Sequence, residues 1–309
     1  MTNDRKWVIV TVLVVILLPL ALVVIEARSF YVDNRNNGSF VSSGQTREYL
    51  LYVPRSYDRT KPTPLVISMH GAAGWPAQQM NISGWNRLAE SEGLIVVYPS
   101  GMSGSGPRVW RGGLESGLMP DVTFISDLIG TLEVAYNIDP EKIYANGVSN
   151  GAEMAFVLSC TLSDQIAAFG LVAAAHTTDW DLCTDQRPVP MITFHGTADR
   201  LTPYNGGGSV VAPRPFPDIP GFTANWARRN RCDADPVEAV VAANVTRREY
   251  ANCADEAGVV FYTVRGGGHT WPGGGPLPEW LVGPNNREID ATSVMWEFFR
   301  EHPLRPLTP

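Results

Sequence analysis

Residues 142–156, KIYANGVSNGAEMAF, decide how the rest of the chain is interpreted. The first five residues have the composition of a short buried strand, Gly147–Gly151 forms a G-x-S-x-G pattern, and the following residues have the composition of a helix. A strand, a sharp turn and a helix with this pattern at the turn are typical of a nucleophile elbow. Ser149 is therefore the candidate nucleophile. The N–H of Asn150, at the helix start, is a candidate donor to an oxyanion. The alternative is a chance match of a glycine- and serine-containing turn.

The segments on either side of this stretch alternate between predicted strands and helices. Pro64–Met69 and Val189–Phe194 are hydrophobic runs typical of buried strands, and Asp121–Tyr136 has apolar residues at helical spacing. This alternation predicts a mostly parallel central sheet with helices on both faces. Further strands are expected at Arg47–Pro54, Leu94–Tyr98, Ala167–Ala175, Val237–Val241 and Val259–Val264, and further helices at Ser83–Glu92, Ile219–Asn230 and Ala291–Glu301.

The beginning of the chain is predicted to be a membrane segment. Trp7–Ile25 carries no charged residue, and at ~1.5 Å per residue a helix of this length crosses a bilayer. No A-x-A cleavage pattern follows, which favours a retained anchor over a cleaved signal peptide. The expected organisation of the 309 residues is an anchor or uncleaved signal at 1–28, a linker at 29–43, one catalytic α/β domain at 44–303 and a tail at 304–309.

Charge and motif content argue against several other classes of function. The net charge is −7, whereas nucleic-acid binding needs a basic face. The five histidines form no H-E-x-x-H motif and no close pair. P-loop and dinucleotide-binding patterns do not occur either. We therefore expect no nucleic-acid partner, no metal and no cofactor.

Two motifs that follow predicted strands complete the candidate site. Asp199 ends HGTAD after one strand, and His269 lies in GGGHTWP after another. The chain order Ser149, Asp199, His269 is the Ser…Asp…His order of α/β-hydrolases. In this arrangement the histidine removes the serine proton and the aspartate orients the imidazole. The alternatives are Asp179, Asp181 and Asp185 for the acid and His70, His176 and His195 for the base, of which His176 has the strongest position because it ends a strand.

Two tryptophans are predicted to lie close to this chemistry. Trp271 follows His269 by two residues, and Trp110 lies in a long loop after a predicted strand. Two indoles at the same sheet edge would offer a flat apolar wall to an aromatic or short hydroxyacyl ester. In the alternative, Trp271 packs inward and only holds the loop that carries His269.

The four cysteines are predicted to form disulfides. An even count beyond a membrane segment is typical of an oxidising compartment. Three pairings are possible, and Cys160–Cys183 with Cys232–Cys253 is favoured because each bond closes a short loop. The alternative is four buried thiols.

The motifs together resemble those of the polyhydroxybutyrate depolymerase and feruloyl esterase group of secreted α/β-hydrolases. The resemblance implies a single-domain serine esterase with Ser149, Asp199 and His269 as its triad. It also implies oxyanion N–H groups at Asn150 and at Ala72, in the HGAAG loop, where several relatives carry cysteine. The matching stretches are REYLLYVP, VISMHGAAG, VYPSG, the Trp110 loop, PDVTFISDLI, IYANGVSNGAEMAF, FHGTADRLTPYNGG and GGGHTWPGG.

The expected function is hydrolysis of short hydroxyacyl, feruloyl or acetyl esters through an acyl-enzyme. A cell-envelope acyltransferase with the same triad and a non-catalytic tethered binding protein are the alternatives. The expected location is secreted or extracytoplasmic, with the chain anchored through Trp7–Ile25. The sequence does not predict the oligomeric state.

Overall fold

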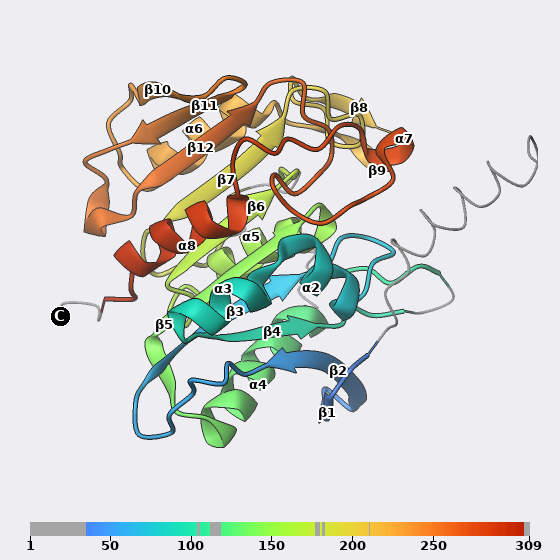
Figure 1. Ribbon diagram of the computed structural model, residues 1–309. Helices are drawn as coiled ribbons and strands as arrows, with labels where there is room; N and C mark the ends of the chain where they lie inside the picture. The colour runs from blue at the N-terminus through green and yellow to red at the C-terminus, as the bar shows by residue number, and fades with distance from the viewer. Residues whose placement is uncertain are drawn as a thin grey trace, which may run out of the picture.

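A ten-stranded sheet forms the centre of the molecule in the computed structural model, which describes residues 35–103, 106–111, 119–176, 180, 183–209 and 211–305 (Figure 1). The strand order is β1-β2-β4-β3-β5-β6-β7-β12-β11-β10. The bounds are β1 Gly38–Ser42, β2 Gln45–Tyr52, β3 Thr63–Met69, β4 Ile95–Pro99, β5 Ile138–Val148, β6 Ala168–Val172, β7 Met191–Gly196, β10 Val237–Ala242, β11 Val245–Tyr250 and β12 Val259–Val264. A separate small ribbon pairs β8 (Gly207–Ser209) with β9 (Ala212–Phe216).

The middle of the sheet is parallel and its two sides are antiparallel. Strands β4, β3, β5, β6, β7 and β12 run in one direction. On one side β2 and β1 pair antiparallel, and on the other side β11 and β10 do so. Because the central strands are parallel, the loops that follow them emerge at one common edge of the sheet.

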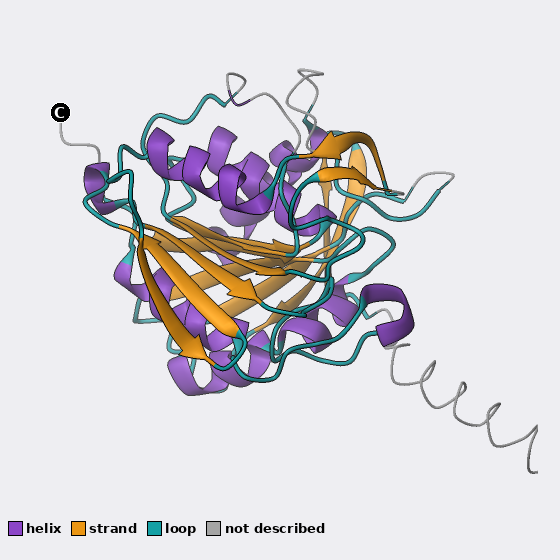
Figure 2. Ribbon diagram, turned by 90° about the horizontal axis from the view of Figure 1, so that it is seen from above, coloured by secondary structure: helices purple, strands orange, loops and turns teal. Residues whose placement is uncertain are grey.

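Helices cover both faces of the sheet, as Figure 2 shows. Alternate residues of β3 point to opposite faces: Leu65 and Ile67 belong to one buried cluster and Val66 to the other. The first cluster includes residues of α4, α5 and α6, and the second includes residues of α2, α3 and α8. The helix bounds are α2 Pro76–Ser83, α3 Trp85–Glu92, α4 Pro120–Ala135, α5 Asn150–Thr161, α6 Ile219–Arg229, α7 Glu279–Val282 and α8 Ala291–Glu301, with a 3-10 turn, η3, at Ala254–Glu256.

The predicted linker needs correction where it meets the domain. Gly38–Ser42 is strand β1, which pairs with β2 across a turn at Ser43 and Gly44. Both turn residues have positive φ, 49° and 74°, which suits a tight hairpin. The sheet therefore begins before residue 44. The hydrophobic pattern did not reveal this strand because only Phe40 and Val41 are apolar in it.

In the described part of the chain, no helix is both long enough and apolar enough to span a bilayer. The predicted segment Trp7–Ile25 lies outside the described residues.

The structure contains both predicted disulfides. Cys160, on α5, is bonded to Cys183, and Cys232, after α6, is bonded to Cys253, after β11. The pairing of neighbouring cysteines is confirmed.

Candidate active site

Ser149 lies at a sharp turn between β5 and α5, as the sequence pattern predicted. Its backbone has φ 53° and ψ −128°, which a residue with a side chain rarely adopts. Its N–H donates to the carbonyl of Val172 at 2.9 Å. Its own carbonyl accepts from the N–H groups of Ala152 and Glu153 at 2.8 and 3.0 Å. Hydrogen bonds on both sides therefore hold the strained residue in place.

The two glycines of the pattern allow this turn to sit on neighbouring backbone. A Cβ on Gly151 would lie 2.4 Å from the carbonyl oxygens of Met69 and His70, at the end of β3. A Cβ on Gly147 would lie 2.4 Å from the carbonyl carbon of Gly151. Any larger residue at either position would push the start of α5 away from the sheet edge.

His269 and Asp199 form a buried hydrogen-bonded pair. The Nδ1 of His269 lies 2.8 Å from Oδ2 of Asp199. The other carboxylate oxygen, Oδ1, accepts from the N–H groups of Leu201 and Thr202 at 2.9 and 2.8 Å. This arrangement assigns the proton to Nδ1 of the neutral ring, so Nε2 is free to act as a base.

A second histidine holds the same carboxylate. The Nε2 of His195 lies 3.3 Å from Oδ2 of Asp199 and 2.8 Å from the carbonyl oxygen of Thr202. Burial alone would raise the pKa of Asp199, but hydrogen bonds from His195 and His269, and their charges, hold that pKa well below its usual range. Asp199 therefore stays ionised. The sequence offered His195 only as an alternative base, although its i,i+4 spacing from Asp199 was a usable signal.

The three predicted residues follow parallel strands at the same sheet edge. Ser149 follows β5, Asp199 follows β7, and His269 follows β12. The charge of His269 also acts on Glu153, in the first turn of α5. Burial raises the pKa of Glu153, while a hydrogen bond from Asn150 and the charge of His269 lower it. His269 therefore lies close to the start of the helix that Ser149 precedes.

The two predicted oxyanion donors flank Ser149. Asn150 is the first residue of α5, and the first N–H groups of a helix have no partner within the helix. Ala72 lies in the loop after β3, and its N–H donates to no other described residue. A Cβ on Gly71 would lie 3.4 Å from Cβ of Ser149, so this loop lies against Ser149.

Both tryptophans of the predicted apolar wall are buried. Trp110 is 4% exposed, and its indole N–H donates to the carbonyl of His70 at 2.8 Å. Trp271 is 1% exposed, and its indole N–H donates to Oγ1 of Thr292, on α8, at 2.9 Å. This burial favours the alternative in which Trp271 holds its loop. A role in substrate contact stays a prediction for both residues.

His176 and Asp185, two of the alternative residues that the structure describes, have other contacts. His176 stacks on Phe156 of α5, with ring centroids 5.0 Å apart. Asp185 pairs with Arg229, whereas Asp179 and Asp181 lie outside the described residues. Within the described ranges no group of three or more metal-ligating side chains could hold a metal ion.

The architecture is shared with a solved hydrolase structure. The acetyl xylan esterase from Aspergillus awamori matches with a TM-score of 0.58 over 82% of this chain and 94% of that chain, at 18% sequence identity. The chain therefore has an α/β-hydrolase-like fold.

Sequence comparisons identify the family within this fold. Residues 47–179 match the family model described as esterase PHB depolymerase. Feruloyl esterase B of Piromyces equi is 31% identical over 229 residues, which are 72% of this chain and 42% of that protein. Feruloyl esterase C of Emericella nidulans is 26% identical over 260 residues, 82% of this chain and 83% of that protein. The chain thus belongs to a polyhydroxybutyrate depolymerase/feruloyl esterase-like family, and the resemblance that the motifs predicted is confirmed.

Proposed function

We propose that the protein is a serine carboxylic ester hydrolase in which Ser149, His269 and Asp199 form the catalytic triad. The observation that carries this proposal is the buried His269–Asp199 hydrogen bond of 2.8 Å, at the sheet edge where Ser149 occupies a strained turn. The feruloyl and acetyl xylan esterases among the relatives support a carboxylic ester as substrate.

The first half of the reaction forms an acyl-enzyme. Nε2 of His269 takes the proton of Ser149 as Oγ attacks the ester carbonyl. The N–H groups of Ala72 and Asn150 stabilise the negative charge that develops on the carbonyl oxygen. The tetrahedral intermediate then expels the alcohol, which receives its proton from His269. Asp199 stabilises the charged imidazole because its own pKa lies well below the usual range.

The second half of the reaction releases the acid. Water takes the place of the alcohol, and its oxygen attacks the acyl carbon while His269 accepts its proton. The bond from the acyl carbon to Oγ of Ser149 then breaks, the acid leaves, and His269 returns the proton to Oγ. An alcohol acceptor in place of water would make the same triad an acyltransferase. Product analysis with and without added alcohol distinguishes the two reactions.

The proposed substrates are short hydroxyacyl, acetyl or feruloyl esters. Two disulfides support a working location in an oxidising, extracytoplasmic compartment. The proposed anchor at Trp7–Ile25 would hold the domain on the extracytoplasmic side of the membrane. Protease added to intact cells should then digest the domain, and protection of the domain from this protease would contradict the proposed location.

A serine-directed probe tests the nucleophile. Ser149→Ala should abolish covalent labelling by a fluorophosphonate and lower kcat for p-nitrophenyl acetate and methyl ferulate by at least ~10⁴-fold. The matched control is Ser91→Ala, because the hydroxyl of Ser91 donates only to the nearby carbonyl of Leu88 on the surface. Labelling that persists in Ser149→Ala would refute the assignment.

A further inference from the structure

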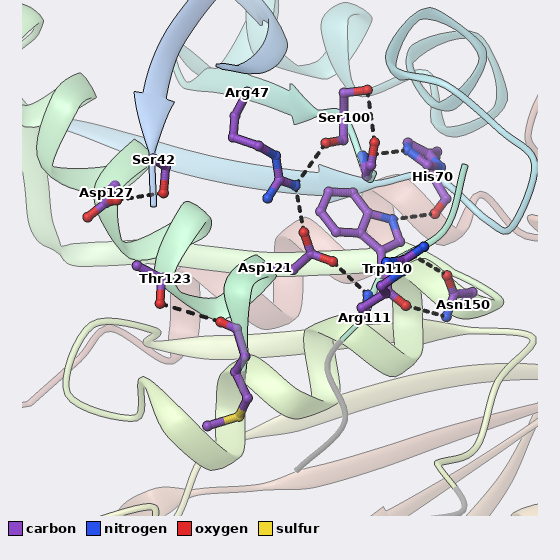
Figure 3. A network of polar contacts seen from close by, with 12 residues as sticks. Ser42, Arg47, His70, Ser100, Trp110, Arg111, Asp121, Thr123, Asp127 and Asn150 are labelled. Carbon is purple, nitrogen blue, oxygen red and sulfur yellow. Dashed lines mark hydrogen bonds and ion pairs between the residues drawn. The ribbon is translucent and has the colours of Figure 1, made fainter. Parts of the chain in front are cut away.

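Residues 108–111, here called the Trp110 strap, lie between the two segments that carry the proposed oxyanion donors (Figure 3). An isolated antiparallel bridge joins Val109, within the strap, to Met102, with N···O distances of 3.0 and 3.1 Å. This bridge holds the beginning of the strap against Met102.

The side chain of Asn150 forms hydrogen bonds with one side of the strap. The N–H of Trp110 donates to Oδ1 of Asn150 at 2.7 Å, and Nδ2 of Asn150 donates to the carbonyl of Trp110 at 3.3 Å. Nδ2 also donates to Oε2 of Glu153 at 3.1 Å. A single amide thus pairs with both backbone groups of Trp110, which fixes the strap against the first residue of α5.

The other side of the strap holds the loop that carries Ala72. The indole N–H of Trp110 donates to the carbonyl of His70 at 2.8 Å, and the N–H of Ala73 donates to the carbonyl of Arg108 at 2.8 Å. Ala72 lies between these two bonds in the chain. The strap therefore fixes the backbone on both sides of the proposed donor.

The direction of the Ala72 N–H is set by the peptide that contains it. The carbonyl of Gly71 accepts from Nδ1 of His70 at 2.7 Å and from the N–H of Gly74 at 3.0 Å. A trans peptide is planar, so its N–H points away from its C=O. Nε2 of His70 accepts from the N–H of Gly101 at 3.0 Å, which leaves the ring proton on Nδ1. By fixing the direction of the Gly71 carbonyl, the ring of His70 also fixes the opposite direction of the Ala72 N–H.

A buried ion pair anchors the far end of the strap. The N–H of Arg111 donates to Oδ2 of Asp121 at 2.6 Å, and Oδ1 of Asp121 pairs with Nη2 of Arg47 at 2.6 Å. Arg47 also donates to the carbonyl of Ser100 at 3.2 Å, and its guanidinium lies 3.8 Å from the ring centroid of Phe124. Asp121 is fully buried and Arg47 is 5% exposed. The carboxylate therefore joins the strap to β2 and α4.

We propose that Trp110 is a positioning residue of the oxyanion hole, which joins Asn150 to the His70–Gly71–Ala72 segment and keeps the two N–H donors at a fixed separation. Such donors stabilise a transition state only when both lie within hydrogen-bond distance of the developing oxyanion. This inference rests on the proposed ester hydrolysis at Ser149. It assigns Trp110 a role in holding the donors, in place of an exposed wall against the substrate.

The test is the variant Trp110→Phe, which keeps a large ring and removes the indole N–H. Activity on p-nitrophenyl acetate is measured together with inhibition by an alkyl trifluoromethyl ketone. In the inhibited enzyme Oγ of Ser149 bonds to the ketone carbon, the carbonyl electron pair moves to oxygen, and the serine proton passes to His269. We expect kcat to fall by roughly 10- to 100-fold with KM within about twofold, and the inhibition constant to rise by the factor by which kcat/KM falls.

The matched control is Trp226→Phe. Trp226, on α6, is fully buried, and its indole N–H donates to the carbonyl of Val189 at 2.8 Å. This control should lower the melting temperature and leave kcat and the inhibition constant unchanged. An equal loss of kcat in both variants, or wild-type values in Trp110→Phe, would overturn the proposal.

A second variant separates the side chain of Asn150 from its backbone. Asn150→Ala keeps the backbone N–H and removes both side-chain hydrogen bonds to Trp110. It should therefore show the kinetic changes expected of Trp110→Phe. It also provides the test if Trp110→Phe does not fold. An Asn150→Ala enzyme with wild-type kcat and inhibition constant would also refute the proposal. A wild-type protein that neither hydrolyses the ester nor reacts with the ketone would overturn the proposed function, and the inference with it.

Discussion

The buried ring of His70 should make the stability of the protein depend on pH below neutrality. Burial lowers the pKa of His70 from its ordinary 6.5 to about 4, opposed by its hydrogen bond to Gly71 and assisted by the charge of Arg108. Between these two pH values the unfolded chain binds a proton at His70 and the folded chain does not. The free energy of unfolding therefore decreases as the pH falls from 6.5 to about 4.

The size of the effect follows from the gap between the two pKa values. At 1.36 kcal/mol for each pH unit, the gap between 6.5 and about 4 corresponds to about 3 kcal/mol. His70→Asn removes the titrating group and keeps a side-chain N–H near the Gly71 carbonyl. At pH 7 this variant should be less stable than the wild type, because buried contacts are lost. Between pH 7 and pH 4 its free energy of unfolding should decrease less than that of the wild type.

The measurement is urea unfolding of both proteins at several pH values from 7 to 4, followed by tryptophan fluorescence. Other groups with shifted pKa values, such as His302, whose burial lowers its pKa, are present in both proteins and cancel in the difference. The wild-type advantage at pH 7 should shrink by about 3 kcal/mol by pH 4. Two curves that stay parallel over this range would show that His70 titrates normally in the folded protein, and would refute the reasoning.

Two further predictions concern the packing and the disulfides. Trp271→Ala should lower kcat for all esters alike and destabilise the fold by about 3–5 kcal/mol, as a buried tryptophan requires; a selective rise in KM for aryl esters with unchanged melting temperature would support a pocket wall instead. Replacement of Cys232 and Cys253 by serine opens a loop with a sequence separation of 21 and should lower the free energy of unfolding by about 3 kcal/mol; an unchanged urea midpoint would contradict this.

Most of the central architecture could be predicted from local patterns. Val259–Val264 and Ala291–Glu301 have the predicted bounds, because a hydrophobic run and an Asp290 N-cap mark them clearly. Asp290 Oδ1 accepts from the N–H groups of Thr292 and Ser293. The sequence did not predict β11, which is rich in polar and charged residues and is a strand because it pairs with β10 and β12. Strands of this kind depend on their partners more than on their composition.

The residues of the candidate site could be predicted better than the contacts that hold them in place. Ser149 could be predicted because the elbow is a local sequence pattern. The pair of Asp199 and His269 could be predicted from the order of the residues in the chain. The direction of a side chain is not given by its distance along the chain, so Trp271 could be placed near His269 but not inside the core. Contacts such as Arg47–Asp121, which join residues 74 positions apart, depend on the completed sheet.

The location of the energetically unfavourable features supports a functional reading of this sheet edge. The backbone at Ser149 is of a kind that costs of order 1–3 kcal/mol. The pair of Arg47 and Asp121 carries two charges into the core, where hydrophobic residues of similar volume are often at least as stable. Ser149 directly precedes Asn150, and Asp121 accepts from the N–H of Arg111, in the Trp110 strap. Stability alone does not account for the strained Ser149 or for the buried pair of Arg47 and Asp121. Both features are expected if the proposed N–H donors at Ala72 and Asn150 need a fixed arrangement around Ser149.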